Sequence, residues 1–260
     1  MTPAELDLRP AVDPSGARVL EGRTCVVTGT SGGIGSAIAL ALEARGATVC
    51  AVGRRGAALE ATAARGAGAG RFEIYEADLV VDEQVARLAK ALAAREGGVD
   101  VLVHGAGTIA LGDLESASVE DLDRQYATNV RAPYLLTRAL LPSLRATQGE
   151  VVFINSSAGL TARAGIAQYA ATKHALRAIA DSLREEVNPE GIRVLSVYPG
   201  RTATPLQARV HAEEGKTYRP ERLVQPHDVA SVVLNALTLP RSAELTDVIV
   251  RPRLKPTLSS

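Results

Sequence analysis

The sequence predicts an α/β protein in which a doubly wound parallel sheet of about seven strands carries helices on both faces. Short runs rich in β-branched residues alternate along the chain with longer stretches of Ala, Leu and Arg at helical spacing. This alternation is typical of parallel strands joined by crossover helices. Most of the strand candidates are apolar at nearly every position, which indicates burial on both faces of the sheet.

Seven runs are expected as strands and six stretches as helices. The expected strands are Thr24–Thr28, Thr48–Val52, Phe72–Tyr75, Val101–Val103, Val151–Ile154, Arg193–Val197 and Asp247–Val250. The expected helices cover residues 33–45, 56–65, 82–95, 118–145, 167–187 and 227–238. We expect residues 1–22 to be a flexible N-terminal tail and residues 23–260 to form one domain. Pro205–Arg222 is expected to be a short, mobile covering loop.

Composition and charge exclude several classes of function. The 29 basic residues balance the 29 acidic residues, so no electrostatic surface for nucleic acid or an anionic membrane is predicted. No apolar run is long enough to span a membrane, and the N-terminus does not look like a secretory signal. Cys25 and Cys50 lie in strand candidates and are interpreted as buried, reduced thiols of a cytoplasmic protein. The spacing of the four histidines predicts no metal site.

A glycine-rich turn, T-G-T-S-G-G-I-G, follows the first strand candidate at residues 28–35. Glycine lets backbone N–H groups approach a ligand closely, and the start of the next helix adds partial positive charge. A tight turn alone would explain the glycines, but their place in a βαβ unit favours a pyrophosphate site. The expected contacts are Gly29, Ser31, Gly32, Gly33, Ile34 and Gly35.

The second strand candidate ends in Gly53-Arg54-Arg55. An acidic residue at this tip would favour NAD by accepting the ribose 2′-hydroxyl, whereas an arginine accommodates a 2′-phosphate. We therefore expect NADP(H) to be preferred, with Arg54 the main contact and Arg55 beside it, and NAD(H) to be possible. The alternative is a solvated pair of arginines at a helix entrance.

Tyr169 and Lys173 lie one helical turn apart in a helix candidate. A nearby ammonium group lowers the pKa of a phenol, which can then exchange a proton with a substrate oxygen. Taken alone, this spacing also suits an ordinary pair on a helix surface. Ser156 follows the fifth strand candidate, thirteen residues before Tyr169. A hydroxyl group there can stabilise a developing oxyanion.

Together these motifs resemble the short-chain dehydrogenase/reductase family, in its ordinary single-domain form, over about residues 22–250. The resemblance implies a Rossmann fold and a catalytic set of Ser156, Tyr169 and Lys173 with Asn129 as its fourth member. In the family this asparagine bends its helix and holds a water that feeds a proton relay to the lysine. The lysine also holds the ribose hydroxyls of the cofactor.

The resemblance also implies further cofactor contacts. Asp78 would hold the adenine together with Leu79, although capping of a helix would also explain Asp78. His104-Gly105 replaces two asparagines of the family pattern, and we interpret His104 as structural. The remaining implied contacts are Gly105, Ala106, Gly107, Asn129, Tyr169, Lys173, Pro199, Gly200, Thr202 and Thr204, the last of these bonding the nicotinamide carboxamide.

The resulting expectation is an NADP-dependent oxidoreductase that reduces a ketone or aldehyde, or runs the reverse reaction, as a homodimer or homotetramer. The loops expected to line the substrate pocket are Thr108–Leu114, Leu160–Gln168 and Pro205–Arg222. They contain few aromatic residues, which suits an aliphatic or alicyclic substrate. One alternative is a 3-oxoacyl reductase for carrier-linked substrates, with Arg163, Arg201 or Arg209 meeting an anionic group. Another is a catalytically silent relative that only binds NADP.

Overall fold

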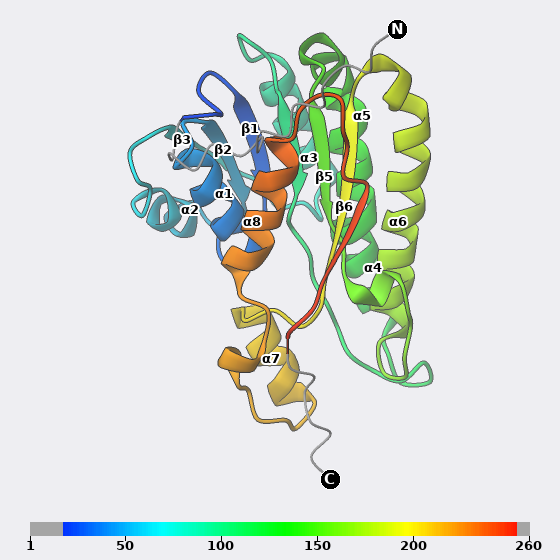
Figure 1. The fold of residues 1–260 in the computed structure, drawn as a ribbon. Helices are drawn as coiled ribbons and strands as arrows, with labels where there is room; N and C mark the ends of the chain where they lie inside the picture. The colour runs from blue at the N-terminus through cyan, green and yellow to red at the C-terminus, as the bar shows by residue number, and fades with distance from the viewer. Residues whose placement is uncertain (1–17, 254–260) are drawn as a thin grey trace, which may run out of the picture.

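The computed structural model describes residues 18–253, which form a seven-stranded sheet between two layers of helices (Figure 1). All neighbouring strands pair in parallel, in the order β3-β2-β1-β4-β5-β6-β7. The strand order reverses between β1 and β4, and ligands of such sheets bind beyond the carboxyl ends of the strands at this point. The predicted doubly wound parallel sheet is confirmed.

The elements agree closely with the expected ranges. The strands are β1 (Thr24–Thr28), β2 (Thr48–Gly53), β3 (Arg71–Glu76), β4 (Val101–His104), β5 (Glu150–Ile154), β6 (Arg193–Pro199) and β7 (Asp247–Val250). The helices are α1 (Gly33–Glu43), α2 (Gly56–Ala63), α3 (Asp82–Ala93), α4 (Val119–Tyr126), α5 (Ala132–Thr147), α6 (Ala167–Val187), α7 (Pro205–Glu213) and α8 (Pro226–Leu237). A π-helical turn, η1 (Ala127–Arg131), and the 3-10 turns η2 (Ser157–Gly159), η3 (Asn188–Glu190) and η4 (Pro220–Arg222) complete the set.

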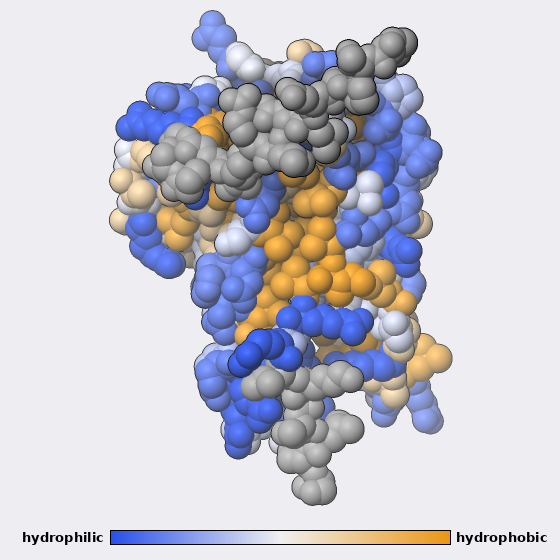
Figure 2. Space-filling model, in the orientation of Figure 1, coloured by the Kyte–Doolittle hydropathy of each residue, from blue (hydrophilic) through white to orange (hydrophobic). Residues whose placement is uncertain are grey.

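Two apolar cores fill the space between the sheet and its helices. Successive side chains of a strand point to opposite faces. Val27 therefore packs with residues of α1 and α8, while Val26 packs with residues of α3, α5 and α6. This two-sided burial is why the strand runs are apolar at nearly every position. The edge strand β7 is less covered: Ile249 is 51% exposed, and apolar surface extends beside α8 (Figure 2).

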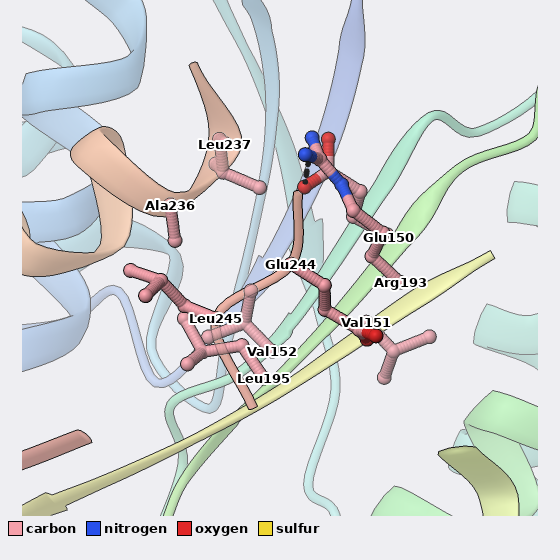
Figure 3. Close-up of a pocket in the computed structure, with 9 residues that line it drawn as sticks. All are labelled: Glu150, Val151, Val152, Arg193, Leu195, Ala236, Leu237, Glu244 and Leu245. Atoms are coloured by element: carbon pink, nitrogen blue, oxygen red, sulfur yellow. Dashed lines mark ion pairs between the residues drawn. The ribbon is translucent and has the colours of Figure 1, made fainter. Parts of the chain in front are cut away.

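Buried ion pairs close the amino edge of the sheet. The Glu150 carboxylate, only 4% exposed, bonds Arg23 and Arg193 at 3.0 Å each. Glu150 and Arg193 begin the adjacent strands β5 and β6, and they line a small cleft with Glu244 (Figure 3). The pairs of Glu150 with Arg23 and Arg193 therefore tie together the starts of β1, β5 and β6.

Two expected elements differ in the structure. The helix expected at 118–145 is interrupted by η1, where the Ala132 N–H bonds the Ala127 carbonyl five residues earlier. The segment Pro205–Arg222, expected as a loop, instead begins with helix α7. A threonine cap at Thr204 and a proline at the first helical position explain why this helix forms.

The last five residues of the expected tail are part of the fold. Residues 1–17 lie outside the described part of the chain, but residues 18–22 belong to the fold. Leu20 is 1% exposed and packs in the core beneath α1, and its N–H bonds the Arg45 carbonyl at 3.0 Å. Burial of one leucine therefore anchors the entrance to β1.

Among the described residues, none of the helices is both long and apolar enough to cross a membrane. Cys25 and Cys50 are free and buried, as predicted. Burial raises the pKa of the Cys25 thiol to about 12, which suits an inert core residue. The cytoplasmic location stays a prediction.

Replacing Leu20 with alanine should lower the free energy of unfolding by about 2–4 kcal/mol, because the change leaves a cavity in the core. Urea denaturation measures the effect. The adjacent Val19, which is 44% exposed, provides the matched control, and Val19→Ala should change stability by less than about 0.5 kcal/mol. Equal effects of the two variants would contradict this packing.

Candidate active site

The turn after β1 packs against the tip of β4 with only backbone between them. Gly29 has a φ of +79°, and a Cβ there would lie 2.8 Å from the Cα of Ala106. A Cβ at Gly35 would overlap the carbonyl of Gly29. No side chain caps the start of α1, so backbone N–H groups are left for a ligand. The cradle therefore fits the pyrophosphate expected from the sequence.

Thr28 joins the same two strand tips, and the sequence reasoning assigned it no role. Its Oγ1 accepts hydrogen bonds from the N–H groups of Gly105 and Ala106, each at 3.1 Å. The same hydroxyl donates to the Val103 carbonyl at 3.4 Å. Thr28 opens the glycine motif, and that position is the signal that could have revealed this role.

The tip of β2 carries the two expected phosphate contacts. Arg54 and Arg55 are exposed, and neither forms an ion pair with a carboxylate in the described part of the chain. Asp78 does not cap α3, whose cap position is Val81, so the capping alternative is wrong. Asp78 Oδ1 instead accepts from Val80 N at 3.1 Å, while Leu79 is 7% exposed and packs in the core. Leu79 thus offers a ligand mainly its backbone.

His104 is a structural residue at the end of β4. It is 2% exposed, its ring stacks on Phe153 with centroids 4.9 Å apart, and its Nε2 bonds Thr137 Oγ1 at 2.7 Å. Burial lowers the pKa of the imidazole to about 3, so the ring is neutral at physiological pH. The ring therefore links β4 to α5 at the position where the family pattern has asparagine.

The tip of β5 and the first turns of α6 bring together three of the four residues of the predicted catalytic set. Lys173 is buried; its Nζ lies 5.9 Å from the centroid of the Tyr169 ring and donates to the Ile154 carbonyl at 3.0 Å. The Ser156 hydroxyl accepts from the Ala158 N–H at 3.1 Å and lies near enough to the Tyr169 phenol to oppose the rise of its pKa. A serine, a phenol and an ammonium group thus share one site.

Asn155, which the sequence reasoning also left unassigned, holds these elements together. Its Nδ2 donates to the Lys173 carbonyl at 3.1 Å, and its Oδ1 accepts from the Ser156 N–H at 2.9 Å. A Cβ at Gly159 would lie 2.9 Å from the Lys173 carbonyl. The close approach of η2 to α6 therefore depends on this amide side chain and on a glycine.

Asn129 lies in the π-turn η1, close to the same site. Its Oδ1 accepts from Thr108 N at 2.9 Å, and its Nδ2 donates to Thr108 O at 2.9 Å and Thr172 Oγ1 at 3.0 Å. The side chain therefore ties the loop after β4 to α6. A Cβ at Gly107 would lie 3.8 Å from Lys173 Nζ, so this glycine borders the ammonium.

The pKa of Tyr169 moves in the direction opposite to the one expected from the sequence. Burial raises the pKa of the phenol, and its hydrogen bond with Ser156 opposes the rise. Burial also lowers the pKa of the Lys173 ammonium from 10.5 to about 8. Loss of hydration is the main cause of both shifts, and the ammonium bonds the Ile154 carbonyl rather than the phenol.

The segment after β6 crosses the glycine turn. Thr204 Cγ2 would lie 3.1 Å from a Cβ at Gly33, and its Oγ1 accepts from Gln207 N at 3.1 Å as the cap of α7. The Thr204 proton is therefore left to donate to a ligand. Thr202, preceded by Pro199 and Gly200, is 5% exposed and donates to the Gly200 carbonyl at 3.0 Å.

Helix α7 is fastened over the carboxyl edge by arginines. Arg209 Nη2 donates to the Ile109 carbonyl at 3.1 Å. Glu214 pairs with Arg163 at 3.3 Å and Arg201 at 2.7 Å, while Arg209 pairs with Glu213 at 3.3 Å. All three arginines considered for an anionic substrate are thus already paired with carboxylates.

These features define a dinucleotide-dependent oxidoreductase of the Rossmann type. The pattern of the family described as short chain dehydrogenase matches residues 23–215, and the chain belongs to this family. It is an NAD(P)-dependent oxidoreductase.

The relatives agree with this assignment. A metagenomic short-chain oxidoreductase, solved in complex with NADP, is 33% identical with a TM-score of 0.78, over 91% of this chain and 100% of the other. An alcohol dehydrogenase from Thermococcus sibiricus, complexed with 5-hydroxy-NADP, is 27% identical with a TM-score of 0.81, over 90% and 98% of the two chains. A glycine betaine reductase of Emericella nidulans is 33% identical over 91% of this chain, which spans only 19% of that protein.

Burial of Lys173 should make stability depend on pH. The folded-state pKa lies below the ordinary value, so the unfolded state binds more protons between pH 8 and 10.5, and stability rises with pH there. Relative to Lys173→Met, the unchanged protein should gain about 2–3 kcal/mol between pH 7 and 10.

Urea denaturation at several pH values measures this gain. Lys90→Met, which changes an exposed lysine of α3, is the control. The difference in stability between the unchanged protein and Lys90→Met should not depend on pH. A pH-independent difference between the unchanged protein and Lys173→Met would show that the ammonium is not buried at a cost.

Proposed function

We propose that the protein interconverts a ketone or aldehyde and the corresponding alcohol with NADP(H), through Ser156, Tyr169 and Lys173 supported by Asn129. The observation that carries the proposal is the position of Lys173 Nζ, 5.9 Å from the centroid of the Tyr169 ring, with Ser156 near enough to the phenol to affect its pKa. These groups lie at the same edge of the sheet as the glycine turn. The NADP complexes of two structural relatives support the choice of cofactor.

When bound, the nicotinamide supplies or accepts the hydride. The hydroxyl groups of Ser156 and Tyr169 bind the substrate oxygen and stabilise its developing negative charge. With its raised pKa, Tyr169 is protonated at neutral pH, so it is ready to donate its proton during reduction. The Lys173 ammonium then stabilises the phenolate that remains. Alcohol oxidation uses the same groups in reverse.

Asn129 acts here mainly as a positioning residue. Its amide oxygen and nitrogen are bonded to Thr108 and Thr172, so a proton relay through Asn129 would use its main-chain carbonyl. The π-turn is the kind of local distortion found at functional sites. The proposed cofactor contacts are Gly29, Ser31, Gly32, Gly33, Ile34, Gly35, Arg54, Arg55, Asp78, Leu79, Gly105, Ala106, Gly107, Asn129, Tyr169, Lys173, Pro199, Gly200, Thr202 and Thr204.

An apolar wall beside the phenol favours an aliphatic or alicyclic substrate. Leu111, Ala158, Ile166 and Ala170 pack together with Tyr169. The Gly112 N–H bonds the Gly165 carbonyl at 3.0 Å, which ties the two loops of this wall to each other. The paired arginines give no support to a carrier-linked substrate. A homodimer or homotetramer stays a prediction, as the family resemblance implies.

Tyr169→Phe should lower turnover of aliphatic and alicyclic ketones by at least about a thousandfold, because it removes the proton donor. The affinity for NADPH, measured by isothermal titration calorimetry, should fall by no more than about tenfold, because Tyr169 is one of many proposed cofactor contacts. Tyr134→Phe, at a 50% exposed tyrosine of α5, is the matched control and should keep full activity.

Retained turnover in Tyr169→Phe would refute the catalytic assignment. NADPH binding by the unchanged protein, without its oxidation by any member of a broad carbonyl panel, would instead support a catalytically silent relative.

Arg54→Gln should weaken NADP⁺ binding about tenfold and leave NAD⁺ binding nearly unchanged, because a charge-assisted bond to the 2′-phosphate is lost. Calorimetric titration with both nucleotides measures the difference. Arg65→Gln removes the same charge from an exposed position beyond the other end of α2, and it should alter neither affinity. Equal weakening of NAD⁺ and NADP⁺ by Arg54→Gln would exclude a contact with the 2′-phosphate.

A further inference from the structure

A carboxylate stands at the corner where the 2′-phosphate of NADP is proposed to bind. Glu76 is the last residue of β3 and pairs in register with Gly53, the last residue of β2. Its exposed side chain reaches across to α2, where Oε2 accepts from the Gly56 N–H at 2.8 Å. Glu76 has no ion-pair partner within residues 18–253. Glu76 and Arg54 therefore flank one corner with opposite charges.

The approach of this carboxylate depends on the residue at the start of α2. A Cβ at Gly56 would lie 2.7 Å from Glu76 Oε2, which is closer than real Cβ atoms come. The cap residue, Arg55, forms no side-chain hydrogen bond to the helix. Because Gly56 has no Cβ and Arg55 does not cap the helix, the N–H of Gly56 is free to donate to Glu76.

We propose that Glu76 is a specificity-determining residue that opposes the 2′-phosphate and keeps NAD(H) usable. This inference rests on the proposed function, in which Arg54 and Arg55 meet that phosphate. The carboxylate repels a second anion and already accepts from the Gly56 N–H, a donor at the start of a helix where anions are favoured. The ribose of NAD carries a 2′-hydroxyl, which donates to a carboxylate. Arg54 therefore favours one dinucleotide and Glu76 the other, and the balance of the two sets the preference.

Removal of the charge tests the assignment directly. Glu76→Gln keeps an oxygen that accepts from the Gly56 N–H but removes the repulsion. In calorimetric titrations at low ionic strength, the dissociation constant for NADP⁺ should fall about tenfold. The dissociation constant for NAD⁺ should stay the same or rise. The strengthening of NADP⁺ binding should be smaller at high salt, because salt screens the repulsion. Glu60→Gln removes the same charge from an exposed position farther along α2, and it should leave both constants unchanged.

A second variant tests the same carboxylate without changing any charge. Gly56→Ala should push the flexible end of Glu76 away from the amide and so strengthen NADP⁺ binding relative to NAD⁺, in the same direction as Glu76→Gln. Thermal midpoints within about 2 °C of the unchanged protein verify folding. Unchanged affinity ratios in both variants would overturn this inference alone. Failure of the unchanged protein to bind either nucleotide would overturn the proposed function as well.

Discussion

Hydrogen bonds in both directions hold α6 against the tip of β5, and the site depends on them. The Asn155 amide reaches the main chain of Lys173, and the Lys173 ammonium reaches the main chain of Ile154. Each bond joins a side chain of one element to the backbone of the other, so neither element can slide along its partner without breaking both. The distance between Ser156 and Tyr169 follows from this junction. A substitution at Asn155 or Gly159 would therefore disturb the arrangement of Ser156 and Tyr169, although neither Asn155 nor Gly159 is proposed to contact the substrate.

The same junction explains why the site costs stability. The Lys173 ammonium is removed from water and has a carbonyl partner but no carboxylate within the described chain, so its charged form is disfavoured. The phenol of Tyr169 is held in its protonated form by the same loss of hydration. In the proposed reduction, the protonated Tyr169 phenol donates the proton and the Lys173 ammonium stabilises the phenolate that remains. The burial that weakens the fold thus prepares the groups for the proposed reaction.

The glycine turn shows a related dependence on close packing. Thr28 bonds the N–H groups of Gly105 and Ala106, and Gly29 lets the two backbones meet. At the opposite edge, buried ion pairs around Glu150 hold the starts of the strands. The sheet is therefore tied at both ends, and Arg209, Arg163 and Arg201 fasten α7 and its C-terminal end over the carboxyl edge.

The sequence by itself determined the order of strands and helices, the glycine turn and the pairing of Tyr169 with Lys173, because periodicity and short motifs are local properties of a chain. The tertiary structure alone decided which neighbours these residues meet. It buried Leu20 within the expected tail, turned the pKa of Tyr169 upward, paired Arg163 with Glu214 and brought Glu76 to Gly56. The burial of a residue and the identity of its bonding partners depend on residues far apart in the sequence. A local sequence pattern contains no information about which distant residues come into contact.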